Sequence, residues 1–159
     1  MARLQEVPLW MSPAPSVQPH RAEYHPSADW LGEHGRNPAM AKGVEFTNIP
    51  IFAQEIVRMP MMTLHELAHA YHDRVLGFEH AEIEAAYRRA VESKSYEAVE
   101  RSNGKTERAY ALVNAKEYFA ETTEAFFGRN DFYPFNGAEL ERHDPEMHRL
   151  LKRIWLGDK

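Results

Sequence analysis

The sequence of 159 residues contains no cysteine. This absence excludes disulfide bonds and thiolate metal sites, so any metal ion must be bound by His, Asp or Glu side chains or by backbone oxygen. Basic residues are also in the minority, because 19 Lys and Arg face 24 Asp and Glu, for a formal net charge of −5. A nucleic-acid surface needs clustered positive charge, and we therefore expect no nucleic-acid partner.

Long hydrophobic runs are missing as well. No segment approaches the roughly 20 apolar residues that a membrane span requires, so we expect no membrane partner. Prolines at positions 8, 13, 15 and 19 interrupt the stretch where a signal peptide would be continuously apolar. The sequence thus predicts no signal peptide and favours a cytoplasmic location, while the compartment and the oligomeric state stay open.

The length and the hydrophobic content of 43% fit one globular domain. Residues 1–43 are rich in proline and predict an extended lead-in that packs on the domain, with one short helix near residues 27–34. Residues 44–159 then form the main part of the domain. Its first element is a short strand, because Val44 to Thr47 alternate apolar and polar side chains.

The most informative predicted helix lies between Pro60 and Gly77. Proline is tolerated in the first helical turn, and glycine can end a helix in a left-handed conformation, which gives a helix of about 16 residues. Three-four spacing predicts one buried apolar stripe, with three histidines together on an adjacent face. The stripe consists of Met61, Leu64, Ala68, Tyr71 and Val75, and the histidines are His65, His69 and His72.

The second half of the chain predicts three further helices and a hairpin. A helix is expected at residues 81–93, and a hairpin at residues 96–111 with its turn at Asn103-Gly104. Asn114 caps a helix that runs from residue 115 to 127 and stops at Gly128. After a loop at residues 130–136, Asp144-Pro145 begins the terminal helix. The predicted class is therefore α+β, mainly helical, with a small β-hairpin or sheet.

Chemistry concentrates in the segment His65-Glu66-Leu67-Ala68-His69. Two histidines four positions apart on a helix lie one turn apart on the same side, so both imidazoles can bind one metal ion. Zinc suits neutral imidazole nitrogen, and catalytic zinc uses three protein ligands with one position left for water. Glu66, beside the first ligand, is placed to take a proton from that water.

The third ligand must come from elsewhere in the chain. Glu117, Glu121 and Glu124 follow one another at spacings of four and three, which puts three carboxylates on one helix face. Glu117 also has the spacing of a capping box with Asn114, in which its carboxylate folds back on the cap. Spacing alone leaves the ligand role open between Glu117 and Glu121.

The two motifs together resemble the gluzincins of the anthrax lethal factor catalytic-domain type, and also the Mlc titration factor peptidases. The resemblance covers roughly residues 62–127 and rests on the His65 to His69 motif, followed by Tyr110, Asn114 and Glu117-Tyr118-Phe119-Ala120-Glu121. It implies a zincin-like catalytic domain in which Glu117 is the third zinc ligand. It also implies that Tyr110, seven residues earlier, stabilises the developing oxyanion. The first 60 residues carry no match to lethal factor.

Two further residues are expected to support the ligands from outside the metal shell. Glu121, one turn after Glu117, would orient a ligand imidazole, and Asp73, one turn after His69, is the second candidate for that role. His72 is expected to support the site in the same way or to face solvent. We expect the remaining isolated histidines to be ordinary surface or interface residues, namely His25, His80, His143 and His148.

These observations predict a zinc metalloendopeptidase with one Zn²⁺ per chain and a peptide or protein substrate. The strand at Val44 to Asn48 is expected at a sheet edge, where an extended substrate would pair with it. One alternative is a catalytically silent zincin scaffold that binds a peptide or a regulatory partner. Another is a metal-dependent hydrolase of a non-peptide amide. Cleavage specificity, and the choice between endopeptidase and exopeptidase action, stay open.

Overall fold

The computed structural model describes residues 4–13 and 22–157. In these ranges the chain is mainly helical with two small sheets, which confirms the predicted α+β, mainly helical class. The chain divides into two compact units, residues 1–75 and residues 76–159. Within the described ranges, every helix is too short or too polar to span a bilayer.

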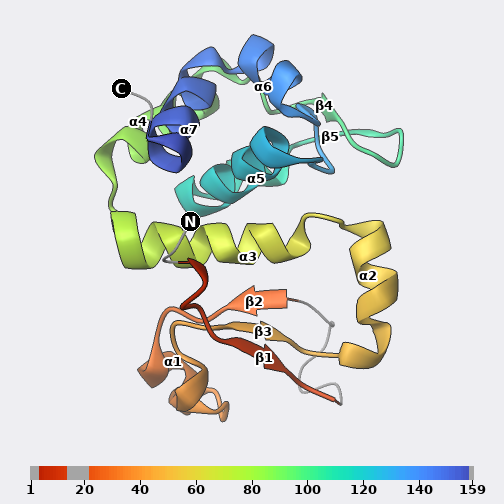
Figure 1. The fold of residues 1–159 in the computed structure, drawn as a ribbon. Coiled ribbons are helices and arrows are strands. Elements are labelled where there is room, and N and C mark those ends of the chain that lie inside the picture. Colours follow the sequence, from red (N-terminus) through yellow and green to blue (C-terminus); the bar gives the residue numbers. More distant parts are fainter. Residues whose placement is uncertain (1–3, 14–21, 158–159) are drawn as a thin grey trace. The chain divides into compact units, whose positions relative to one another are not determined.

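The first unit is built on a three-stranded sheet (Figure 1). Strand β3 (Val44–Phe46) lies in the middle, parallel to β1 (Leu9–Met11) and antiparallel to β2 (Ala22–Tyr24). The expectation of an edge strand at Val44 to Asn48 is therefore wrong, because both edges are occupied by strands from the predicted lead-in. Residues 1–43 thus supply two of the three strands.

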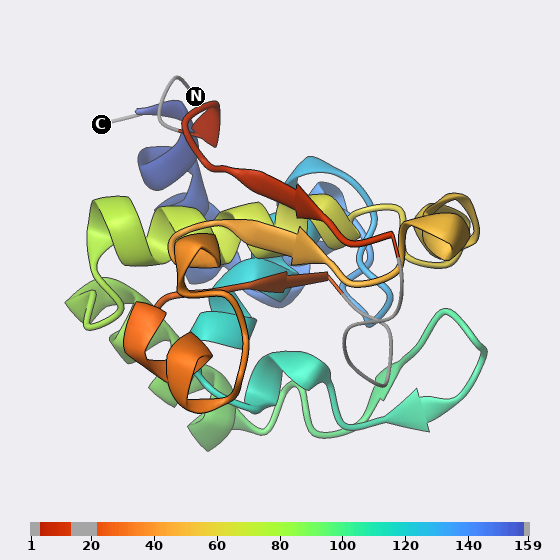
Figure 2. The same cartoon turned by 90° about the horizontal axis from the view of Figure 1, so that it is seen from below.

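Helix α3 (Met62–Tyr71) runs along one face of this sheet and contacts β2 and β3. Figure 2 shows α1 (Ala28–Glu33) and the 3₁₀ turn η2 (Pro38–Met40) towards the other face. The predicted helix at 27–34 is confirmed, since the Ser27 side chain accepts from the Trp30 N–H at its start. A 3₁₀ turn, η3 (Ile49–Ile51), and helix α2 (Phe52–Arg58) connect β3 to α3.

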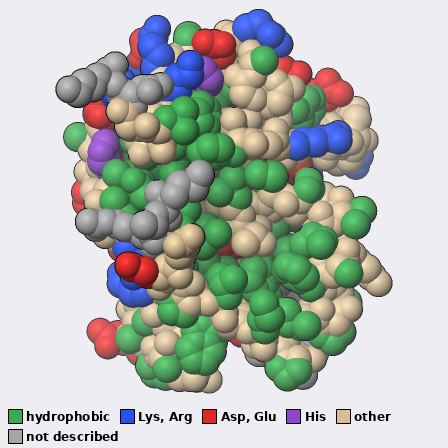
Figure 3. Space-filling view, in the orientation of Figure 1, with side chains coloured by type: hydrophobic (Ala, Val, Ile, Leu, Met, Phe, Trp, Pro, Cys, Tyr) green, Lys and Arg blue, Asp and Glu red, His purple; other side chains and the backbone are tan. Residues whose placement is uncertain are grey.

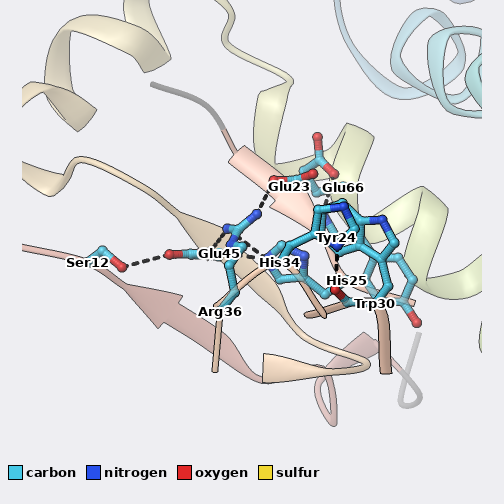
Figure 4. A network of polar contacts seen from close by, with 9 residues as sticks. All are labelled: Ser12, Glu23, Tyr24, His25, Trp30, His34, Arg36, Glu45 and Glu66. Atoms are coloured by element: carbon cyan, nitrogen blue, oxygen red, sulfur yellow. Dashed lines mark hydrogen bonds and ion pairs between the residues drawn. The ribbon is translucent and has the colours of Figure 1, made fainter. Parts of the chain in front are cut away.

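The side of the sheet that carries Glu45 holds a buried polar network (Figure 4). Glu45 is 1% exposed, and it accepts from Ser12 Oγ at 2.8 Å, lies 3.1 Å from His25 Nε2 and binds Arg36. Arg36 also donates to Glu23 at 2.9 Å. A buried carboxylate is tolerated only when it is paired and hydrogen-bonded in this way. His25 is consequently buried, and its expected surface position is wrong.

Several large hydrophobic side chains of the first unit are exposed, and hydrophobic surface is visible in Figure 3. Leu9 and Met11 on β1 are 49% and 61% exposed, and Ile56 and Val57 on α2 are 40% and 82% exposed. Because alternate residues of a strand face the same side, Leu9 and Met11 share one face of the sheet. This face is therefore incompletely covered at β1.

The second unit contains four helices, α4 (Ala81–Ser93), α5 (Ala115–Phe127), α6 (Gly137–His143) and α7 (Pro145–Leu156), among the described residues. Strands β4 (Val99–Glu100) and β5 (Thr106–Glu107) form the predicted hairpin, with Gly104 at a φ of +79° in its turn. The predicted bounds of α4 and α5 and the start of α7 are confirmed. Helix α6 lies outside the sequence prediction.

Helix α5 is the central element of this unit, because it contacts α4, α6, α7 and the 3₁₀ turn η5 (Tyr110–Leu112). Tyr118 of α5 and Tyr96 are buried, and both hydroxyls donate to Oδ2 of Asp144. The other Asp144 oxygen accepts from the Met147 N–H and so caps α7. Burial, with Asp144 beside them, raises the pKa of both tyrosines well above the ordinary value, so both remain donors.

Candidate metal centre

Helix α3 belongs to the first unit and carries both histidines of the motif. The Nε2 atoms of His65 and His69 lie 3.1 Å apart, and the ring planes meet at 81°. Two imidazole nitrogens at tetrahedral positions on one zinc ion, each at about 2.0–2.1 Å, would be about 3.3 Å apart. The observed spacing therefore fits two ligands of a zinc ion with little rearrangement.

The residues of α3 that are buried differ from those of the predicted apolar stripe. Of the five stripe residues only Ala68 is buried, whereas His65 is 8% exposed and His72 is fully buried. A solvent-facing His72 is therefore wrong. At His72 the α-helix changes into a π-helical segment, η4 (His72–Leu76), and Gly77 ends it at a φ of +81° as expected. Single π turns inside helices occur frequently at functional sites.

Glu66 is held by the sheet of its own unit. Its Oε2 accepts a hydrogen bond of 2.7 Å from the backbone N–H of Tyr24 on β2 (Figure 4). The Tyr24 N–H therefore points away from the central strand and towards the helix. A charge-assisted bond to a backbone N–H is among the stronger hydrogen bonds in proteins, so one oxygen of this carboxylate has a defined position.

Asp73 binds the same tyrosine from the other end. Its Oδ2 accepts from the Tyr24 hydroxyl at 2.7 Å and from Lys42 Nζ at 2.6 Å. Burial, followed by the bond to Asp73, raises the pKa of Tyr24 far above its ordinary value, so the hydroxyl stays protonated and donates. These contacts connect α3 and η4 to β2. Support of a ligand imidazole by Asp73 stays a prediction.

The carboxylates of α5 belong to the second unit. Asn114 caps the helix, since its side-chain oxygen accepts from the N–H groups of Lys116 and Glu117. Glu117 thus lies in the first turn and is half-buried, whereas Glu121 and Glu124 are 4% and 5% exposed. Glu121 and Glu124 each have a carboxylate oxygen within 4.8 Å of the other. Two buried carboxylates this close favour a nearby cation.

Tyr110 begins the 3₁₀ turn η5, five residues before α5, and its side chain is 46% exposed. Tyr110 is therefore neither buried nor part of a strand. An exposed phenol is accessible to a substrate, as an oxyanion donor must be.

The candidate residues are divided between the two units. The first unit holds His65, Glu66, His69 and Asp73, and the second holds Tyr110, Glu117 and Glu121.

Three residues that lie beside candidate residues of their own unit were not singled out by the sequence. Tyr24 and Lys42 come from the predicted lead-in and carry no motif, so only their contacts with Glu66 and Asp73 identify them. Glu124 appears in the sequence as a member of the acidic face, and its burial beside Glu121 marks it as more than a solvated residue.

Comparison with known proteins gives no relative for this chain. No family model, no curated protein and no solved structure matches it. The chemistry of its own residues therefore carries the functional argument.

Proposed function

We propose that this chain is a zinc-dependent metalloendopeptidase whose metal is bound by His65, His69 and Glu117. The observation that carries the proposal is the 3.1 Å separation of the His65 and His69 Nε2 atoms, which suits a shared zinc ion. The intervening Glu66, with one oxygen fixed by a backbone N–H, supplies the acid–base group next to the metal ligands. The proposal retains the gluzincin resemblance and one zinc ion per chain.

When bound, the zinc ion would polarise the scissile carbonyl and make water acidic enough to react near neutral pH. Glu66 accepts the proton of the attacking water on its carboxylate and delivers it to the leaving amine nitrogen. Tyr110 donates its hydroxyl proton in a hydrogen bond to the former carbonyl oxygen as negative charge develops there. Stabilisation that arises only in the transition state raises the rate, and the exposure of Tyr110 allows such contact.

Glu117 is the proposed third ligand, and Glu121 is the alternative. The Asn114 cap fixes the first turn of α5 and therefore the backbone that carries Glu117, whose side chain retains access to solvent. Glu121 is nearly buried beside Glu124. A buried carboxylate suits the role of orienting a ligand imidazole, as metal-bound histidines generally require.

The proposal is tested on the full chain with a metal measurement and a cleavage assay. The purified protein should contain about one zinc ion per chain and should cleave members of a mixed peptide library in a chelator-sensitive manner. Glu66→Gln should keep the metal and lose nearly all cleavage, because the amide cannot accept the proton. Glu55→Gln, on α2 of the same unit, is the matched control and should retain both properties.

A folded wild-type protein that binds no zinc would contradict the proposal. Zinc binding with no chelator-sensitive cleavage of any peptide would contradict the peptidase activity. In that case the metal site would serve a binding protein or a hydrolase of non-peptide amides.

A further inference from the structure

Tyr24 makes two contacts with the motif helix and its continuation. Its backbone N–H donates to Glu66 and its hydroxyl donates to Asp73, both at 2.7 Å. Glu66 and Asp73 are seven positions apart, which is about two helical turns, so they lie on nearly the same side of the helix. One tyrosine therefore spans two turns and is bound at both ends.

Tyr24 is buried, and neighbouring groups hold it on two sides. The residue is 6% exposed, and its strand pairs with the central strand β3 at the Glu23–Glu45 and Tyr24–Val44 positions. On the other side, Lys42 donates to the same Asp73 oxygen as the tyrosine hydroxyl, at 2.6 Å. The tyrosine hydroxyl is thus bound by the Lys42–Asp73 ion pair, and the tyrosine backbone is held in place by the pairing of β2 with β3.

We propose that Tyr24 is a positioning residue for the reaction, which holds the Glu66 carboxylate in the direction needed for proton transfer. The inference rests on the proposed function and adds a residue to it. The Tyr24 backbone N–H fixes Glu66 Oε2. The bond from the Tyr24 hydroxyl to Asp73 holds β2 at a fixed position along the helix. Positioning of this kind matters because small displacements of a catalytic group reduce the rate sharply.

The first test measures the contact itself by amide hydrogen exchange of residue 24, in zinc-free and in zinc-loaded full-length protein. In Glu66→Ala the Tyr24 amide should exchange faster by about tenfold or more, because the N–H loses a charged acceptor. Glu55→Ala removes a carboxylate from α2 of the same unit and should leave this exchange rate unchanged. Equal rates in the wild type and in Glu66→Ala would overturn the proposal.

The second test measures kinetics with Tyr24→Phe, which keeps the backbone N–H and removes the hydroxyl. We expect kcat to fall about tenfold, with KM and zinc affinity within about twofold of wild type, since binding groups are untouched. Asp73→Ala should lower kcat by a similar factor, whereas Asp73→Asn, which keeps an acceptor oxygen, should restore most of kcat. Tyr133→Phe is the control, because the Tyr133 hydroxyl has no hydrogen bond with any residue in the described ranges.

The outcomes separate this inference from the proposed function. Wild-type kcat in both Tyr24→Phe and Asp73→Ala would overturn the positioning role while leaving the peptidase in place. A joint loss of kcat, zinc affinity and folded structure would also overturn it, because Tyr24 would then be structural only. Absence of chelator-sensitive cleavage in the wild type would overturn both proposals.

Discussion

The Nε2 atoms of His65 and His69 face each other at 3.1 Å on successive turns of α3. This spacing suits two nitrogen ligands of one metal ion. The spacing of the two nitrogens is set by the helix. Because each histidine would supply one metal ligand, each should be necessary for metal binding.

Zinc should therefore stabilise the wild type but not a variant that lacks one ligand. At a free zinc concentration 100 times its Kd, the free energy of unfolding should rise by about 2.7 kcal/mol. His69→Ala should lose most of this increase, measured as the shift of the thermal midpoint on zinc addition. His34→Ala removes an exposed histidine of the same unit and should keep the full shift. Equal shifts in both variants would place the metal elsewhere.

Substitutions along α5 should distinguish the third ligand. Glu117→Ala should weaken zinc binding more than about 100-fold, whereas Glu121→Ala should weaken it by about 10- to 100-fold as a residue that orients a ligand. Competition with a chromophoric chelator gives both affinities, and Glu92→Ala on α4 serves as the exposed control. The reverse order would make Glu121 the ligand.

Asp144 should be essential for the stability of the second unit. Asp144→Ala removes a helix cap, worth about 1 kcal/mol, and leaves two buried tyrosine hydroxyls without their acceptor. We expect a loss of about 3 kcal/mol or more in urea unfolding of the full chain. Asp144→Asn retains an oxygen for capping and should lose clearly less. A loss below about 1 kcal/mol in the alanine variant would contradict the network.

His143 and His148 should make the second unit less stable in mild acid. His148 is 7% exposed, so its expected surface position is wrong, and His143 is partly exposed. Burial lowers the pKa of His143 and of His148 below the ordinary value of 6.5, although Asp144 and Glu141 respectively act in the opposite direction. As the pH falls below 6.5, the unfolded chain binds protons that the folded chain does not. The free energy of unfolding should consequently decrease from pH 6.5 downwards.

Replacement of these histidines tests that pH dependence directly. In His143→Gln and His148→Gln the decrease between about pH 6.5 and pH 5 should be smaller than in the wild type. Urea unfolding at a series of pH values provides the comparison. An unchanged slope in the double variant would show that other groups cause the acid sensitivity.

The elements with local boundary signals were predictable from the sequence. Helix α5 begins at the Asn114 cap and ends before Gly128, and the hairpin turns at Asn103-Gly104, as expected from cap and turn chemistry. Helix α6 was missed although Asn136 caps it through the Glu139 N–H. At seven residues it is too short to show a clear apolar period.

The sheet of the first unit could not be predicted in the same way, because its pairing is not local. The alternation of Val44, Glu45 and Phe46 is typical of a half-exposed strand, yet all three residues are buried. Glu45 tolerates burial only because Arg36 and His25 bind it from other parts of the chain. The same limit applies to the candidate site. The sequence motif identified His65 and Glu66, but it could not identify Tyr24 as the partner of Glu66, because the two residues are far apart in the chain.

The contact between Tyr24 and Glu66 closes a loop of 42 residues. A helix forms from interactions between neighbours, so the ligand pair of His65 and His69 can arise early and locally, whereas loop closure has an entropic cost and comes with the sheet. A peptide that contains only the motif helix would therefore carry the ligand histidines without an oriented acid–base group. The orientation of Glu66 thus depends on the fold of the whole first unit. It is established only when β2, near the beginning of the chain, packs against α3.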